Sequence, residues 1–328
     1  MVWYDYGMRT LIIFLITIVS LSASPALAQL DTNSLTNPES TIETKPEYPR
    51  PGEEVTATLK DYQGSTYGSK ITWLLDDQVI EEAENQREVK IIAGEAGKTQ
   101  NIKVVLNTPQ GSRVILQNTI NPIYLDIIIE PQTRTPDFYL GRSLPSIGSI
   151  VNATALVSDS GFRDSDLVYT WRLNNQVLEG GPIRGRNQIS FTTPIGDYSS
   201  LYLQVTEPGG VVLAKRAVSI PSVAPEVHFY EVSSLFGISQ KPIAKNLSLI
   251  GNSVTVRAEP YNLDSRVYNN PDIKEWKVNG NKSTDFGGNP YEVTLQRTGT
   301  FGQSSVQFHV RDTKQILQGA QSNILINF

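Results

Sequence analysis

The feature that most constrains this chain is a short pattern that occurs three times along its 328 residues. In each copy a glycine is followed three places later by Val, then by Ala or Val, and further on by a tryptophan. The glycines are Gly52, Gly148 and Gly251, and the tryptophans are Trp73, Trp171 and Trp276. Because the chain is also too long for one ordinary core, the pattern predicts a tandem array of related modules.

The residues that follow each glycine and surround each tryptophan predict β-strands. Apolar and polar residues alternate with period two in Val151–Ala155, as in the other two copies, which is typical of a half-buried strand. Small Ala side chains on the buried face leave room for a large neighbour, so we expect each tryptophan to fill a core. Each tryptophan strand ends in a pair that favours a type I′ turn: Asp76-Asp77, Asn174-Asn175 or Asn279-Gly280.

The remaining pattern is also typical of β structure. Closing hairpins are predicted to turn at 108–111, 207–210 and 312–314, at matching offsets in the three copies. Outside the N-terminal segment there is neither a sustained helical apolar period nor an alternation of strands with helices. We therefore predict an all-β fold built from antiparallel sheets.

The predicted modules are separated by short linkers. We assign residues 1–28 to a signal peptide, 29–40 to a flexible leader, and 41–122, 123–223 and 224–328 to three modules. The linkers at Asn121-Pro122 and Pro221–Pro225 contain proline, which predicts limited flexibility. Three modules joined in this way would form a rod on the order of 100 Å long.

The tryptophan strand carries a resemblance to a known class of modules. The segment Tyr169–Asn175, in which Trp171 and Leu173 precede the turn pair, resembles bacterial immunoglobulin-like and PKD-like surface modules. The resemblance covers residues 40–328, although the chain lacks the paired Cys of antibody domains. It implies three tandem Ig-like β-sandwiches with spacer, adhesion or assembly roles outside the cell, and it implies no catalysis.

The N-terminus carries the pattern of an export signal. Residues 11–21 form an apolar run, and Ala26-Leu27-Ala28 is a small-x-small cleavage site, so Gln29 would begin the mature chain. The run is shorter than the ~20 apolar residues that span a bilayer. An uncleaved anchor stays open as the alternative, and translation could start at Met1 or at Met8, which is followed directly by Arg9.

Composition argues against several functions. The formal net charge is −5 with no cluster of basic residues, which does not favour nucleic acid as a partner. The absence of Cys excludes disulfides and thiolate catalysis, and the two histidines, His228 and His309, offer little for acid–base chemistry. We expect a protein that is not an enzyme and that needs no cofactor.

One acidic loop is a candidate calcium site. Asp159, Asp164 and Asp166 precede the Trp171 strand, and oxygen-rich loops at the end of a sandwich can bind Ca²⁺. The matching loop of the third module contains Asp264, Asn269, Asn270 and Asp272. A solvated polar loop without metal is the alternative in both modules.

Two further groups of residues suggest contact surfaces. Acidic side chains cluster in module one at Asp76, Asp77, Glu81, Glu82 and Glu84, where they would meet a basic partner or protect a strand edge. Phe138 and Tyr139 lie in the long loop that leads into module two. They would form a sugar-stacking or docking patch, or else pack beneath the loop.

Taken together, these features predict an exported surface or envelope protein that acts as a spacer, adhesion or assembly component. Its expected partners are other envelope or surface proteins and polysaccharide. A glycan-binding module and an ancillary partner of a separately encoded enzyme are the alternatives. Extracellular, cell-surface and periplasmic locations all stay open.

Overall fold

The computed structural model describes residues 40–62, 64, 66–283, 288–299 and 301–328. The predicted signal peptide and nearly all of the predicted leader lie outside these residues. Within the described part of the chain, no helix is long and apolar enough to cross a membrane. The first strand begins at Ser40, one residue before the predicted start of module one.

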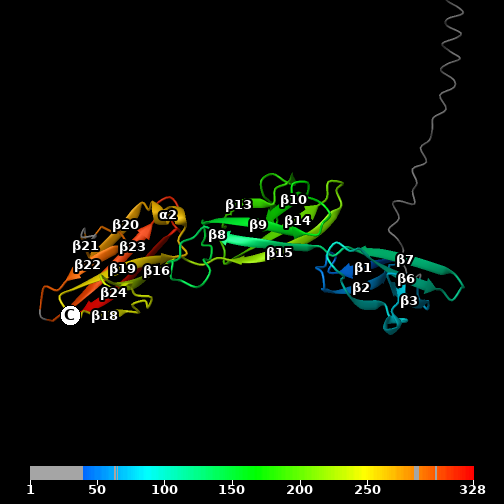
Figure 1. The fold of residues 1–328 in the computed structure, drawn as a ribbon, viewed down its shortest axis with the longest axis horizontal. Coiled ribbons are helices and arrows are strands. Elements are labelled where there is room, and N and C mark those ends of the chain that lie inside the picture. The colour runs from blue at the N-terminus through cyan, green and yellow to red at the C-terminus, as the bar shows by residue number, and fades with distance from the viewer. Residues whose placement is uncertain (1–39, 63, 65, 284–287, 300) are drawn as a thin grey trace, which may run out of the picture.

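Module one, at the N-terminal end of Figure 1, is a sandwich of two sheets. The first sheet has the order β1 (Ser40–Lys45), β2 (Glu54–Asp61) and β5 (Glu88–Ile92). The second has the order β4 (Gln78–Val79), β3 (Lys70–Leu75), β6 (Gln100–Asn107) and β7 (Arg113–Ile120). A short 3-10 helix, η2 (Glu81–Ala83), follows the β3–β4 hairpin.

Module two repeats this plan. Its first sheet has the order β13 (Gln188–Thr192), β9 (Ile150–Ser158) and β8 (Tyr124–Pro131). Its second has the order β11 (Gln176–Val177), β10 (Val168–Leu173), β14 (Tyr198–Thr206) and β15 (Val212–Pro221), with β12 (Ile183–Arg184) paired to β10. The strand that contains the tryptophan therefore lies inside its sheet, as β3 does in module one.

Module three keeps the plan and adds short elements. Its first sheet has the order β17 (Gly237–Ile238), β16 (Glu226–Ser233), β19 (Ser253–Tyr261) and β22 (Glu292–Gln296). Its second has the order β18 (Asn246–Ser248), β24 (Gly319–Asn327), β23 (Gln303–Arg311), β20 (Ile273–Val278) and β21 (Asn281–Ser283). A one-turn helix, α2 (Ser265–Asn269), precedes β20. The all-β prediction is confirmed, and β18 with β24 is the one parallel ladder among the described strands.

The tryptophan strands end in the predicted turns. All six turn residues have positive φ, between 48° and 80°, as a type I′ turn requires. The side chain of the first residue also accepts a hydrogen bond from the neighbouring strand. Asp76 accepts from the Asn101 amide, Asn174 from the Ser200 amide and Asn279 from the Ser305 amide, at 2.8 to 2.9 Å. Asp and Asn therefore both tolerate the left-handed backbone and fix the turn to the sheet.

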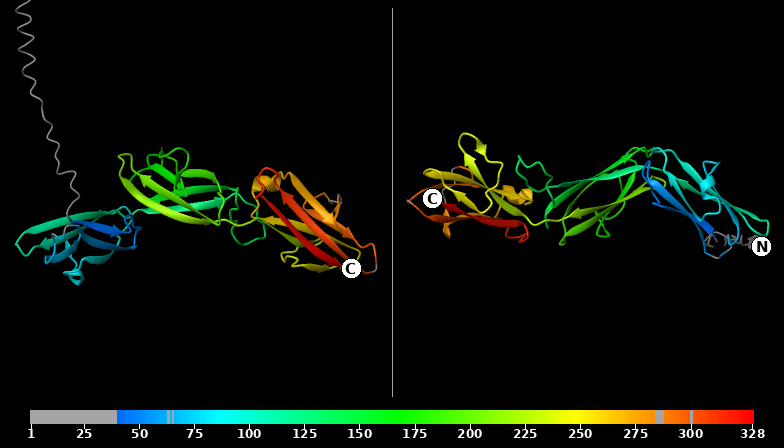
Figure 2. Two further views of the ribbon diagram at one scale, coloured as in Figure 1. Left: turned by 180° about the vertical axis from the view of Figure 1, so that it is seen from behind. Right: turned by 90° about the horizontal axis from the view of Figure 1, so that it is seen from below.

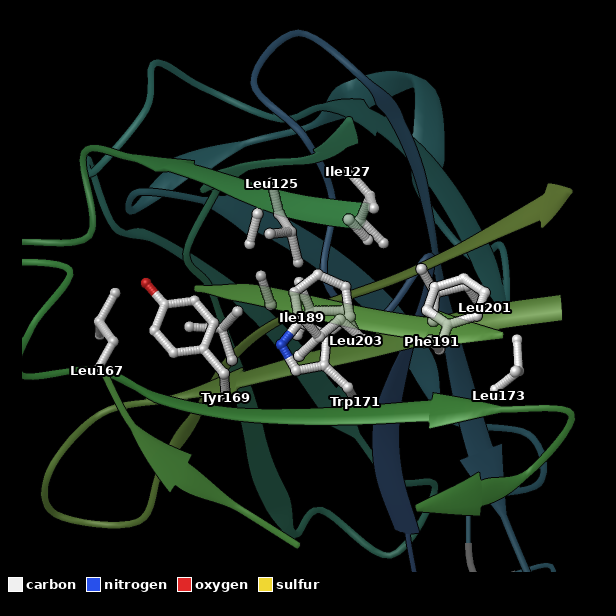
Figure 3. Packing of buried hydrophobic residues seen from close by; sticks show 14 of the residues in the cluster. Leu125, Ile127, Leu167, Tyr169, Trp171, Leu173, Ile189, Phe191, Leu201 and Leu203 are labelled. Atoms are coloured by element: carbon white, nitrogen blue, oxygen red, sulfur yellow. The ribbon is translucent and has the colours of Figure 1, made fainter. Parts of the chain in front are cut away.

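Each module has its own hydrophobic cluster, and each cluster contains one of the repeated tryptophans. The three tryptophan side chains are at most 2% exposed. Each indole N–H donates to a backbone carbonyl, from Trp73 to Gln86, from Trp171 to Arg186 and from Trp276 to Pro290. Figure 3 shows Trp171 in module two among Ile189, Phe191 and Leu203. A buried indole needs such a partner, because an unsatisfied N–H would be costly.

Within the described part of the chain, the three modules follow one another end to end (Figures 1 and 2). The right-hand view of Figure 2 shows a bend between modules one and two. The two junctions therefore determine the shape of the molecule.

Candidate interaction sites at the module junctions

The three acids of the predicted calcium loop do not gather around one point. The Asp166 carboxylate accepts hydrogen bonds from Arg184 at 2.6 Å and Arg163 at 3.0 Å, and these bonds lower the pKa of Asp166. Asp159 and Asp164 are exposed. No group of three or more His, Cys, Asp or Glu in the described part of the chain is placed to hold a metal. Two guanidinium groups already neutralise Asp166, so calcium would have to compete with them for this carboxylate. Calcium at this loop stays an untested prediction.

In the matching loop of module three the four candidate residues do not share one environment, and calcium there stays a prediction. The Asp264 side chain is completely buried, and it caps the start of α2 by accepting a hydrogen bond from the Arg266 amide at 2.8 Å. Asp272 accepts hydrogen bonds from the amide and hydroxyl of Thr313. Asp264 is thus buried where it contacts module two, whereas Asn269, Asn270 and Asp272 remain exposed.

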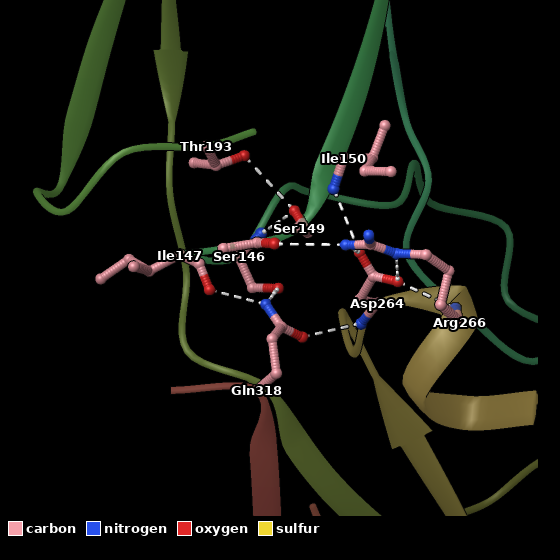
Figure 4. Close-up of polar contacts among 9 residues, drawn as sticks. Ser146, Ile147, Ser149, Ile150, Thr193, Asp264, Arg266 and Gln318 are labelled. Carbon is pink, nitrogen blue, oxygen red and sulfur yellow. Dashed lines mark hydrogen bonds and ion pairs between the residues drawn. The ribbon is translucent and has the colours of Figure 1, made fainter. Parts of the chain in front are cut away.

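Asp264 is the centre of the junction between modules two and three (Figure 4). One carboxylate oxygen accepts a hydrogen bond from the Ile150 amide of module two at 3.1 Å. The Arg266 guanidinium donates to both carboxylate oxygens, each at 2.9 Å. The charge is therefore neutralised by a neighbour in its own module, and the remaining hydrogen-bonding capacity is directed at the other module.

Gln318 forms the second half of this junction. Its carbonyl oxygen accepts from the Asp264 amide at 2.9 Å, and its amide nitrogen donates to the Ser146 hydroxyl at 2.9 Å and to the Ile147 carbonyl at 2.6 Å. Gln318, Ser146 and Asp264 are all 0% exposed. A network with every member paired stabilises one arrangement, since breaking any contact strands a buried polar group.

The backbone also pairs across this junction. Thr133 and Asp264 form an isolated antiparallel bridge. The Arg134 amide donates to the Leu263 carbonyl at 2.7 Å, and the Asn262 amide donates to the Arg134 carbonyl at 2.8 Å. Modules two and three are thus joined by strand-like hydrogen bonds as well as by side chains.

Burial raises the pKa of Asp264, but the hydrogen bonds from Arg266 and from the Ile150 amide outweigh it. The net effect holds the pKa of Asp264 below its ordinary value. The carboxylate is therefore ionised at neutral pH, which is the form that can accept all of these hydrogen bonds.

The junction between modules one and two is made of more exposed contacts. Arg50 donates to the Leu125 carbonyl at 3.0 Å and to the Asp126 carboxylate at 3.1 Å. The Lys215 ammonium lies 3.2 Å from Glu47 and 4.5 Å from the ring centre of Tyr48. These side chains keep roughly a third or more of their surface in water. Exposed ion pairs contribute at most about 1 kcal/mol each and are screened by salt.

A groove of about 490 Å³ lies beside the junction of modules two and three. Phe138 and Tyr139 line it from module two, and His228, Tyr230 and Tyr261 line it from module three. Phe138 packs edge-on against Tyr230 with ring centres 5.1 Å apart, and Tyr139 packs edge-on against Tyr261 at 5.3 Å. Phe138 is therefore packed between the two modules, whereas Tyr139 remains 44% exposed, and a sugar-stacking or docking role for this pair stays a prediction.

A larger groove of about 780 Å³ runs between β8, the end of β15 and residues 142–145. In module three, β18 pairs with the corresponding end of β24. In module two, the Leu144 amide donates instead to the Asn262 side chain of module three. The groove is therefore a consequence of the same junction.

The remaining predicted surface residues are partly paired. In the acidic hairpin, Asp77 lies 2.6 Å from Lys103 and Glu84 lies 2.6 Å from Lys70. His228 and His309 lie on β16 and β23, which belong to different sheets of module three. They therefore do not form a common site.

Sequence reasoning missed Gln318 and the tyrosines at 230 and 261. These residues come from strands far from the leading loop of module two, and only the packing of two modules brings them beside Phe138. One usable signal was present: Asp264-Ser265 is typical of a helix start, and a capping Asp is usually held by backbone amides rather than by metal.

No family model matches the chain, and no curated protein matches it by sequence. Among solved structures, it is similar to fibronectin(III)-like modules of CbhA from Clostridium thermocellum, with 13% identity, coverage of 56% of this chain and 93% of that chain, and a TM-score of 0.27.

Two further solved structures share this distant similarity. The three N-terminal domains of the outer capsid protein Hoc of bacteriophage RB49 have 12% identity and a TM-score of 0.25, and the match covers 88% of this chain and 97% of that chain. The glucan-utilisation protein SGBP-B of Bacteroides ovatus, in complex with a mixed-linkage heptasaccharide, has 13% identity and a TM-score of 0.23. This match covers 89% of this chain and 70% of that chain. These likenesses carry no argument about what this chain binds.

Proposed function

We propose that this protein is an exported, non-enzymatic surface or envelope component whose modules act as a spacer in adhesion or assembly. The observation that carries the proposal is the buried junction between modules two and three, centred on Asp264 and Gln318. A flexible string of domains would not need a fully paired polar network between two of its members. Such a junction is useful where a protein must hold its ends at a fixed separation.

The arrangement of the sandwiches supports the same proposal. The three modules lie in a row, so that opposite ends of the molecule face different surroundings (Figure 1). Sheet edges such as β7 and β15 have a partner strand on one side only within the described residues. Edges of this kind are a general way for sandwich modules to engage other proteins.

Cross-linking in the cells that make the protein, followed by fractionation and mass spectrometry, tests the proposal. We expect the protein in an envelope or surface fraction, with Gln29 as its N-terminus and linked to other envelope or surface proteins. Recovery as a monomer in the medium without cross-links would contradict an assembly role. Recovery in the cytosol with residues before Gln29 intact would contradict export.

A further inference from the structure

The two leading loops that distinguish modules two and three from module one converge on a single groove. Residues 138–141 of module two form one wall, and Gln240 and Pro242 of module three lie on another. The floor is the outer face of the sheet that contains β16 and β19, from which Tyr230 and Tyr261 project. Module one has no comparable loop between β1 and β2, so the groove depends on features added to the common plan.

The groove is mainly aromatic and carries two other polar side chains, of which His228 is bonded on one side to Glu226 at 3.1 Å. Neither Lys, Arg, Asp nor Glu is found among the described residues that line it. The lining includes three tyrosines, one phenylalanine, His228 and Gln240. A charged ligand would find no partner in this lining, whereas an uncharged ligand with apolar faces and many hydroxyl groups would find both rings and hydrogen-bonding groups.

Tyr139 is held so that its ring remains available at the rim. The backbone of Gly141 passes directly behind this ring, and a Cβ atom at Gly141 would lie only 2.5 Å from its hydroxyl-bearing carbon. On the other side, Tyr139 packs against Tyr261. The absence of a side chain at Gly141 therefore positions Tyr139 while leaving nearly half of its surface exposed.

Two tyrosine hydroxyls provide a polar site beneath the rim. The hydroxyl groups of Tyr230 and Tyr261 lie 2.6 Å apart, so one donates to the other. This bond uses one of the two hydroxyl hydrogens and leaves the second, with the remaining lone pairs, for another partner. Burial and the bond to Tyr230 raise the pKa of Tyr261, so its hydroxyl stays protonated.

We propose that this groove binds an uncharged carbohydrate chain, with a sugar ring against Tyr139 and sugar hydroxyls bonded to His228, Gln240 and the Tyr230–Tyr261 pair. The C–H face of a sugar ring packs on an aromatic side chain, while its rim of hydroxyls needs donors and acceptors at the sides. This inference goes beyond the spacer role, because it assigns a ligand class to one junction. A spacer could exist without it.

The test is calorimetric titration of the mature chain, residues 29–328, with neutral oligosaccharides: α- and β-linked glucans, a mannan and a galactan. We expect at least one to bind, and Tyr139→Ala to weaken that binding about tenfold, the effect of losing one aromatic contact. Tyr67→Ala is the matched control, since Tyr67 is 89% exposed in module one and far from the groove. It should leave binding unchanged.

Two further variants separate a binding site from a merely structural cluster. Tyr261→Phe keeps the ring and removes one hydroxyl, so it should weaken sugar binding without lowering the melting temperature by more than a few degrees. Gly141→Ala should displace the Tyr139 ring and weaken binding in the same way. Failure of every neutral sugar to bind, or equal loss of binding in Tyr67→Ala, would overturn the proposal. Binding of a proline-rich peptide in place of sugar would also overturn it.

Discussion

At the scale of single residues, the three tryptophans show how a repeat in the sequence becomes a repeat in structure. Each occupies the centre of one hydrophobic cluster, and each donates its indole N–H to a carbonyl at a similar place in its module. Small residues such as Ala153 and Ala155 on the facing strand are fully buried and leave the space that the indole fills. The pattern could be predicted from sequence because both partners lie in local, periodic segments.

Replacement of a core tryptophan should destabilise its module. Trp171→Ala removes a side chain that is 2% exposed and strands the Arg186 carbonyl, so we expect a loss of about 3–5 kcal/mol in the free energy of unfolding. Chemical denaturation followed by circular dichroism measures this loss. Tyr198→Ala, at a 70% exposed position in the same module, should have almost no effect. An unchanged denaturation midpoint for Trp171→Ala would contradict the role given to this residue.

At the scale of elements, the sequence predicted strands and turns well and the junctions poorly. The turn pairs Asn174-Asn175 and Asn279-Gly280 carry their conformation in their own chemistry, which is why the hairpins form where they were predicted. Asp264, by contrast, has the same local sequence whether it faces water, a metal or another module. Only its burial against Ile150, which precedes it by more than 100 residues, decides among these. Such contacts leave no periodic signal in a single sequence.

The junction between modules two and three should depend on the Asp264 carboxylate. Asp264→Ala leaves the Ile150 amide without its acceptor and Arg266 without its partner. We expect modules two and three to unfold in one calorimetric transition in the native protein and in two separate transitions in the variant. Asp137→Ala, an exposed carboxylate near the same junction, is the control and should keep the single transition. A single transition in both variants would contradict the coupling.

The same junction should weaken in acid. The pKa of Asp264 is lowered in the folded protein, so its ionised form contributes stability above the ordinary carboxyl pKa of about 4. That contribution is lost as pH falls through the lowered pKa. We therefore expect the coupled transition of modules two and three to separate below about pH 4. Calorimetry across pH 2.5–7 measures it, and a transition as coupled at the lowest pH as at pH 7 would contradict the assignment.

At the scale of the whole molecule, the two junctions differ in kind. Modules two and three share a buried network and paired backbone, whereas modules one and two meet through Arg50–Asp126 and Lys215–Glu47, which remain partly in water. Both linkers are short and contain proline, so the two junctions could not be distinguished from the sequence. We therefore expect a joint between modules one and two that salt can loosen, followed along the chain by a stiffer pair of modules two and three.

The junction between modules one and two should respond to salt and to the loss of Arg50. Arg50→Ala removes the ion pair with Asp126 and the bond to the Leu125 carbonyl. We expect this variant, and the native protein at 1 M salt, to sample a wider range of angles between the two modules. Small-angle X-ray scattering of residues 29–328 should show a broader distribution of intramolecular distances. Lys245→Ala, at an exposed position of module three, is the control, and an equal change in it would contradict the assignment.

The most direct test of the central claim is the distance between spin labels placed on neighbouring modules. The chain contains no Cys, so labels can be attached at introduced pairs such as Tyr198→Cys with Leu235→Cys across modules two and three, and Tyr67→Cys with Tyr198→Cys across modules one and two. We predict a narrow distance distribution, insensitive to salt, for the first pair, and a broader one that widens with salt for the second. A distribution across modules two and three as broad as that across modules one and two would contradict a rigid junction centred on Asp264.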